Sequence, residues 1–154
     1  MYLAVVVLLM GVLPLGSILV EALVSHGDAG IVFLIGKWFV FWSVGVRLLL
    51  AGVRQIVNPA FTAETIFGLK DTGALTIVRE LGFANLSIGL FGALSLLNRG
   101  WIVPAALVGG LFYGLAGLEH LRKGDRNTTE NIAMVSDLFI FMVLAGFLAL
   151  TEAA

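Results

Sequence analysis

The sequence predicts an all-α integral membrane protein, a helical bundle of five transmembrane helices that forms one domain over residues 1–154. Hydrophobic residues make up 60% of the chain and charged residues only 12%, and the mean hydropathy is +1.06. These values exclude an ordinary soluble domain. Five segments reach the roughly 20 apolar residues that an α-helix needs to cross a bilayer core. The connections between them are short, so sequential helices are expected to be antiparallel neighbours.

The predicted spans are residues 2–24, 31–57, 74–97, 101–121 and 132–150. The formal net charge is −1, and no basic face interleaved with aromatic residues is present, which argues against a nucleic-acid partner. The chain contains no cysteine, so disulfides, thiolate metal sites and thiol catalysis are excluded. The first apolar stretch lacks the basic residues of a signal peptide and is interpreted as a retained span.

The first span contains Pro14, which is expected to kink the helix or to leave a carbonyl unpaired. Glu21 closes this span. His26 lies in the following turn and is interpreted as a loop residue rather than a ligand.

The second span is the most polar of the five. Its polar and small residues recur at helical spacing and form a stripe: Ser43, Arg47, Ala51, Arg54 and Asn58. Lipid offers no hydrogen-bond acceptor, so this stripe is expected to face other helices. Arg47 lies too deep to reach the interface, and we predict that it pairs with Glu80 or Asp137. The stripe is interpreted either as part of an internal ion pair or as a binding group for an anion or a substrate.

Asn58 and Pro59 end the second span and resemble the start of a new helix, with Asn58 as the N-cap. The apolar and polar residues over 60–69 predict a short interfacial helix that does not cross the membrane. In the third span, Glu80 is predicted to face the bundle. Asn85, the other polar candidate of this span, lies about 140° from Glu80 around a helix that turns about 100° per residue.

The fourth span has small residues at four-residue spacing, at Ala106, Gly110 and Gly114. Such a groove allows another helix to approach closely. The motif does not decide whether that helix belongs to the same chain or to a second copy in a homo-oligomer. The span ends on the pair Glu119 and His120.

The fifth span follows the longest polar run of the chain, residues 118–137. Asn127 and Glu130 are predicted to form a capping pair at its start, since Glu130 follows Asn127 by three residues. Glu130, Asp137, Leu144 and Thr151 share one stripe of this helix. The stripe places Asp137 on the face nearest the preceding loop.

Lysine and arginine residues are distributed unevenly between the two sides. One side holds six of them: Arg54, Lys70, Arg79, Arg122, Lys123 and Arg126. The other side holds two, Lys37 and Arg99. The positive-inside rule then predicts a cytoplasmic N-terminus and an external C-terminus. In either orientation, antiparallel threading brings the same set of ionisable residues to one leaflet: Arg47, Arg54, Glu80, Glu119, His120 and Asp137.

The candidate site is therefore a polar cluster at the cytoplasmic side, made of Arg47, Arg54, Glu80, Asn85, Glu119, His120 and Asp137. A first interpretation is a structural network of ion pairs. A second is a metal site at Glu80, Glu119 and His120, since imidazole and carboxylates suit a divalent cation. Adjacent Glu119 and His120 diverge by about 100° on a helix, however, and the arginines repel a cation, so no metal is the preferred prediction.

The third interpretation is a pocket for an anionic or quinone-like amphiphile held by Arg47 or Arg54. His120 or a carboxylate of the cluster would relay protons, and His120 is the one whose ordinary pKa lies near neutrality.

Three stretches resemble the DoxX-like family of small membrane proteins. They are VRLLLAGVRQIVNPAFTAETIFGL (46–69), RELGFANLSIGLFGALSLLNRGWIVPAALVGGL (79–111) and DLFIFMVLAGFLAL (137–150). The resemblance covers about residues 40–152, with the first span as an addition, and it places Arg47, Glu80 and Asp137 at the polar positions of the family. It implies a four-helix core in a bacterial or archaeal inner membrane, sometimes partnered with redox enzymes of sulfur or quinone metabolism.

Three functions are consistent with these features. The preferred one is a non-catalytic membrane subunit, or a protein that binds a lipid or a quinone-type ligand. The alternative is an intramembrane metal-dependent or proton-relay enzyme that uses Glu80, Glu119, His120 and Asp137. A small transporter is less favoured, because a permeation path needs polar groups in both halves of the membrane and this cluster occupies one.

Overall fold

The computed structural model describes residues 2–25, 29–66 and 68–152, and every regular element in these ranges is helical. Five helical segments are long and apolar enough to cross a membrane, which confirms the predicted spans: Tyr2–Val24, Ile31–Val57, Thr72–Leu94, Arg99–Arg122 and Thr128–Thr151. The chain is thus a multi-pass helical protein. The elements in order are α1 (Tyr2–Val7), η1 (Leu8–Val12), α2 (Leu13–Val24), α3 (Ile31–Phe39), η2 (Val40–Val46), α4 (Arg47–Val57), η3 (Phe61–Ile66), α5 (Thr72–Leu94), η4 (Arg99–Trp101), α6 (Ile102–Arg122) and α7 (Thr128–Glu152).

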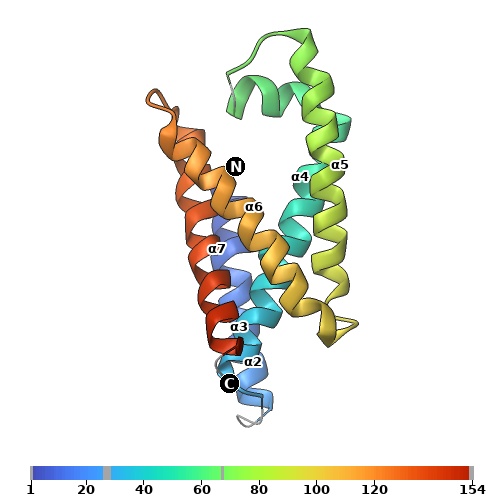
Figure 1. Ribbon diagram of the computed structural model, residues 1–154, viewed down its shortest axis with the longest axis vertical. Helices are drawn as coiled ribbons and strands as arrows, with labels where there is room; N and C mark the ends of the chain where they lie inside the picture. Colours follow the sequence, from blue (N-terminus) through green and yellow to red (C-terminus); the bar gives the residue numbers. More distant parts are fainter. Residues whose placement is uncertain (1, 26–28, 67, 153–154) are drawn as a thin grey trace.

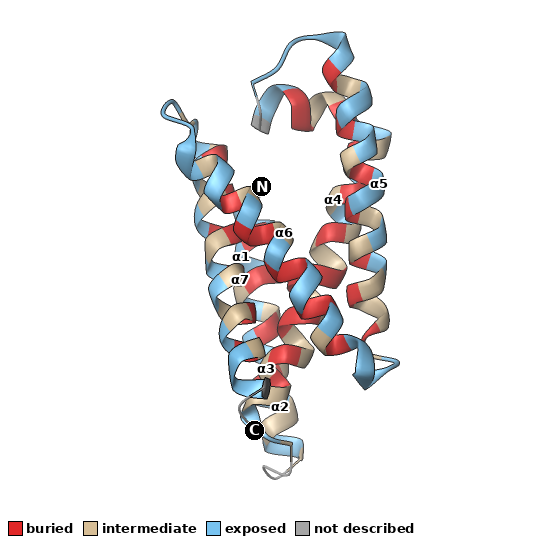
Figure 2. Cartoon of the chain, viewed as in Figure 1, coloured by how far each residue is buried: buried red, intermediate tan, exposed pale blue. Residues whose placement is uncertain are grey.

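The helices form two arms that meet at one end and diverge at the other (Figure 1). Helices α4 and α5 make up one arm, and α6 and α7 the other, each pair packed along its length. The first span and α3 pack against the α6–α7 arm. Buried residues gather along α6 and the helices that it crosses (Figure 2). Short η3 lies at the diverging end (Figure 1).

The arm of α4 and α5 is held together by direct backbone contact at glycines. A Cβ atom added to Gly52 would lie 2.6 Å from the backbone nitrogen of Leu86, and one added to Gly92 would lie 2.7 Å from the nitrogen of Gly45. Gly89 is equally close to the backbone of Leu49. This contact was not predicted, although Gly45 and Gly52 are spaced by seven residues and share one helix face.

The groove predicted on α6 is occupied by α7 of the same chain. A Cβ atom on Gly114 would lie 2.7 Å from the ring of Phe141, and one on Gly110 would lie 3.5 Å from Leu144. Ala106 at the end of this series is fully buried. Of the two partners that the motif allows, α7 of the same chain therefore packs against Ala106, Gly110 and Gly114. A homo-oligomer stays a prediction.

Two of the spans contain π-helical turns. In η1 the Leu13 N–H bonds to the Leu8 carbonyl, five residues back, immediately before Pro14. The disturbance expected at Pro14 thus takes the form of a π turn, in which the wider ring accommodates a residue without an N–H. In η2 the Arg47 N–H bonds to the Trp42 carbonyl in the same way. Arg47 therefore directly follows a π turn and is the first residue of α4.

The short helix predicted after Pro59 is present as η3 and does not span the membrane. Ala63 is fully buried and packs with Ala74 and Val78 of α5. This small cluster attaches η3 to the α4–α5 arm. Asp71 caps the start of α5 by accepting a hydrogen bond of 3.1 Å from the Gly73 N–H.

The predicted capping pair at the start of α7 is confirmed. The Glu130 N–H donates to Asn127 Oδ1 and the Asn127 N–H donates to Glu130 Oε2, both at 2.9 Å. Glu130 is 2% exposed and also forms an ion pair with Lys123. The α6–α7 loop is thereby fixed over the end of its own arm.

Replacing Asn127 by alanine is expected to lower the free energy of unfolding by about 1 kcal/mol, the usual loss of an N-cap acceptor. Asn127→Asp is the matched control, because the carboxylate keeps an acceptor in the same place. Denaturation of both variants in mixed micelles measures the difference. Equal stability of Asn127→Ala and the wild type would show that the cap contributes nothing here.

The ends of the chain and His26 lie outside the described residues. The predicted placement of the N-terminus in the cytoplasm and of Ala154 outside the cell accordingly stays a prediction, as does the choice of the inner membrane.

Candidate functional site

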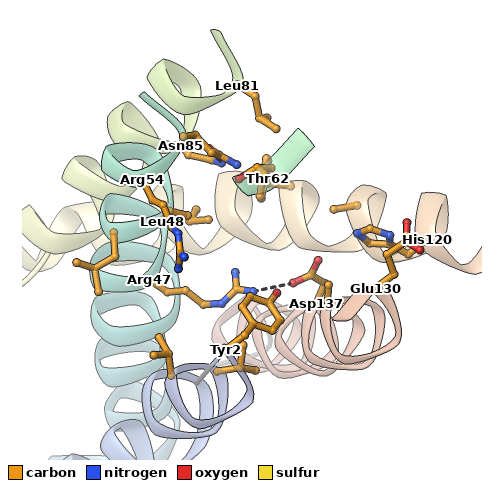
Figure 3. Close-up of a pocket in the computed structure, with 18 of the residues that line it drawn as sticks. Tyr2, Arg47, Leu48, Arg54, Thr62, Leu81, Asn85, His120, Glu130 and Asp137 are labelled. Carbon is orange, nitrogen blue, oxygen red and sulfur yellow. Dashed lines mark hydrogen bonds and ion pairs between the residues drawn. The ribbon is translucent and has the colours of Figure 1, made fainter. Parts of the chain in front are cut away.

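A cavity of about 860 Å³ lies between the two arms and is walled by α1, α4, η3, α5, α6 and α7. Figure 3 shows the side chains that project into it. Apolar residues form much of the wall, among them Val6, Leu48 and Phe112. Charged residues enter this apolar surface at two levels, one deep between the arms and one near the diverging end.

The deep level is an ion pair between the arms. Arg47 Nη2 of α4 lies 3.6 Å from Asp137 Oδ1 of α7, with side chains 14% and 9% exposed (Figure 3). Arg47 also donates a hydrogen bond of 3.4 Å to the hydroxyl of Tyr113. That hydroxyl donates in turn to the Ser43 carbonyl at 2.5 Å. The prediction that Arg47 pairs with a carboxylate of another helix is confirmed for Asp137.

Two acceptor atoms of residues that line the cavity are buried without a hydrogen-bond partner. One is Asp137 Oδ1, since its distance to Arg47 is too long for a hydrogen bond. The other is Asn85 Oδ1, although the Asn85 amide nitrogen donates to Gln55 Oε1 at 2.7 Å. Neither atom finds a donor anywhere in the described part of the chain. Buried acceptors of this kind are costly unless something else supplies the donor.

The second level, near the diverging end, is predominantly basic. The Arg54 guanidinium lies over the ring of Phe61, 3.5 Å from the ring centroid, and no carboxylate of the described ranges comes within ion-pair distance of it. Lys123 pairs with Glu130. Arg122 and Glu119 also line the cavity and are exposed.

The α6–α7 loop is ordered around Arg126. Its Nη1 donates to the carbonyls of His120 at 3.0 Å, Leu121 at 3.1 Å and Lys123 at 2.5 Å, which satisfies free carbonyls at the end of α6. Asn127 Nδ2 donates to the Thr65 carbonyl of η3 at 3.3 Å. This last bond joins the two arms at the diverging end.

Six of the seven predicted site residues line this one cavity: Arg47, Arg54, Asn85, Glu119, His120 and Asp137. Glu80 does not, and the expectation that it faces the bundle is wrong. The buried face of α5 runs through Gly82, Asn85 and Gly89. Glu80 precedes Gly82 by two residues, roughly 200° around the helix, so it lies on the exposed side.

Several contributors to the site were not predicted from the sequence, among them Tyr113, Gln55 and Phe61. A signal existed for Tyr113, because it shares the buried face of α6 with Gly109, Gly110 and Gly117 at spacings of three and four residues. Gln55 and Phe61 carried no comparable signal, since their roles depend on how α4 meets α5 and η3.

The metal site considered at Glu80, Glu119 and His120 is not assembled. Glu80 lies on the outer face of α5, away from the cavity that the other two line. No group of three histidine or carboxylate side chains within residues 2–25, 29–66 and 68–152 is close enough to hold a metal ion.

The model of a family of unknown function (DUF6790) matches residues 4–154. No curated protein and no solved structure matches the chain. The resemblance to DoxX-like proteins stays a prediction.

Proposed function

The chain belongs to this family of unknown function (DUF6790), and we propose from the geometry of its cavity that it is a non-catalytic protein that binds a membrane amphiphile, of the lipid or quinone type. The ligand occupies the space between the arms, with its polar end at the charged residues and its apolar part along the apolar wall. The protein acts in the inner membrane, alone or as the ligand-holding subunit of a redox-enzyme complex of the kind found with DoxX-like proteins.

The observation that supports this proposal is the coexistence of a large apolar cavity with charged groups inside a membrane span. The volume of about 860 Å³ falls in the range of roughly 300–1,000 Å³ typical of small-molecule sites. An ion pair that only tied the bundle together would be expected in a closely packed interior. Here Arg47 and Asp137 instead form part of a cavity wall.

The other two functions are less well supported. A transporter needs a polar path through both halves of the bundle, whereas the half opposite the cavity is filled by close contacts such as that between Gly109 and Val44. An intramembrane enzyme would require a connected set of acid–base groups. No hydrogen bond joins His120 to Glu119 or Asp137 among the residues that the structure describes.

Filling the cavity is expected to exclude the ligand. Ala116 of α6 lines the cavity, and Ala116→Phe adds a ring to that space. Its expected effect is an about tenfold loss of bound amphiphile, since overpacking a site costs about 1–3 kcal/mol. Ala84→Phe is the matched control because Ala84 is exposed on the outer face of α5.

Mass spectrometry of an organic extract of each purified protein measures the amount of amphiphile per chain. Each protein is first exchanged into fresh detergent to remove loosely associated lipid. The amphiphile in an extract of that detergent alone is the background. Retention of the same amount by Ala116→Phe and Ala84→Phe would overturn the proposal, as would wild-type protein with no amphiphile above background.

A further inference from the structure

We infer that the bound amphiphile is a phospholipid whose head group carries both a phosphate and an N–H or O–H donor, as in phosphatidylethanolamine and phosphatidylglycerol. This inference rests on the proposed function and specifies the ligand of the same cavity. It follows from the two levels of polar groups, which differ in the chemistry that would complete them.

The basic level requires an anion. Arg54 is exposed to the cavity, and its guanidinium is oriented by stacking on Phe61 at 3.5 Å from the ring centroid. A stacked guanidinium keeps its N–H groups directed outward in its own plane, where a phosphate accepts two of them. In the parts of the chain that the structure describes, no carboxylate lies within ion-pair distance of Arg54.

The buried acceptors of the cavity wall require a donor. Asp137 belongs to the deep level, whereas Asn85 bonds to Gln55 and so lies near the level of Arg54. Asp137 is 6% exposed and Asn85 is 3% exposed, and each has a buried oxygen without a hydrogen-bond partner. Both residues line the same cavity as Arg54 (Figure 3). A ligand group that approaches them must donate, because two acceptors cannot satisfy one another. An ammonium or a hydroxyl at the end of a head group meets this need.

The apolar wall selects a lipid rather than a soluble phosphoester. Leu50, Leu81 and Phe112 line the space between the arms, where acyl chains would lie. A neutral quinone suits this wall equally well, but its carbonyl oxygens are acceptors only. It would leave the oxygens of Asp137 and Asn85 without a donor and would offer Arg54 no charge.

The first test uses wild-type protein, delipidated in detergent and titrated with short-chain lipids that share identical acyl chains. Phosphatidylethanolamine and phosphatidylcholine have the same net charge, and only the former has N–H donors. We expect phosphatidylethanolamine and phosphatidylglycerol to bind about tenfold more tightly than phosphatidylcholine, the effect of one hydrogen bond to a charged acceptor. Equal affinities for the three lipids would overturn the inference.

Two variants separate the levels. Arg54→Gln is expected to weaken binding of all three lipids about tenfold, because each carries the phosphate. Arg79→Gln, an exposed arginine of α5 outside the cavity, is the matched control and should bind as the wild type does. Asp137→Asn should reduce the preference for phosphatidylethanolamine over phosphatidylcholine. If this variant does not fold, the wild-type selectivity and Arg54→Gln still decide the question.

A last titration shows whether the bound phosphate belongs to a lipid or to a soluble phosphoester. Glycerophosphoethanolamine has the same head group without acyl chains, and it should bind far more weakly than the lipid. Equal binding would overturn the assignment to a lipid. The outcomes are distinguishable from failure of the proposed function, because loss of head-group selectivity leaves the Ala116→Phe effect intact, whereas absence of that effect removes the cavity as the binding site.

Discussion

Replacing Arg47 by leucine is expected to destabilise the folded protein by about 3–5 kcal/mol, the range found when one partner of a buried ion pair is removed. The loss arises from Asp137, whose side chain is 9% exposed and would be left buried without its cation. Arg47 is the residue that faces Asp137 Oδ1, and that oxygen has no hydrogen-bond donor in the described ranges. The tyrosine hydroxyl of Tyr113 would keep its bond to the Ser43 carbonyl.

The double variant Arg47→Leu/Asp137→Asn should recover part of this loss, because it removes both charges. Its destabilisation is expected to be smaller than the sum of the two single effects, as for residues in direct contact. Arg79→Leu, at an exposed position of α5, controls for the substitution itself. Denaturation in mixed micelles gives the free energies of unfolding of the wild type, the two single variants, the double variant and the control. A double variant no more stable than Arg47→Leu would show that the two residues do not interact.

Replacing Gly89 by alanine is expected to destabilise the protein by about 2–3 kcal/mol, the upper part of the range for overpacking. Its added methyl group would collide with the backbone of Leu49, which cannot move aside as a flexible side chain can. The sign is informative, because alanine in a helix is otherwise favoured over glycine by about 1 kcal/mol.

Gly146→Ala is the matched control, since nothing lies within 4 Å of a Cβ atom placed there. It should leave the melting temperature unchanged or raise it slightly. Gly110→Ala should also be tolerated, because its Cβ would meet Leu144 at an ordinary 3.5 Å. Equal melting temperatures for Gly89→Ala and Gly146→Ala would show that α4 and α5 do not touch at this point.

The sequence was sufficient for the features that a single physical constraint determines. Length and hydropathy define the five spans, since a helix of about 20 apolar residues crosses the bilayer core with every backbone group paired within the segment. The depth of Arg47 requires a carboxylate, and Asp137 supplies it. The three-residue spacing of Asn127 and Glu130 was enough to predict the reciprocal hydrogen bonds at the start of α7.

Features that depend on the choice between two faces of a helix were not predictable in this way. Helix α5 has polar residues on both sides. The prediction that Glu80 faces the bundle was wrong, because glycines rather than charged residues determine which side of α5 is buried. The sequence did not decide which helix packs against the α6 groove for the same reason, because a face of small residues accepts any helix that fits. The π turns of η1 and η2 change which residues face inward, and no spacing rule in the sequence anticipates them.

The arrangement of the two arms has a consequence for biosynthesis. The most extensively packed pairs, α4 with α5 and α6 with α7, are consecutive in the chain, so each hairpin can form soon after it is made. The pair of Arg47 and Asp137 is different, because its two members belong to the second span and the last. Arg47 therefore enters the membrane before its counter-charge has been translated, at an insertion cost of about 2.5–3.5 kcal/mol for a central arginine. The apolar residues around it must retain the second span in the bilayer until α7 arrives.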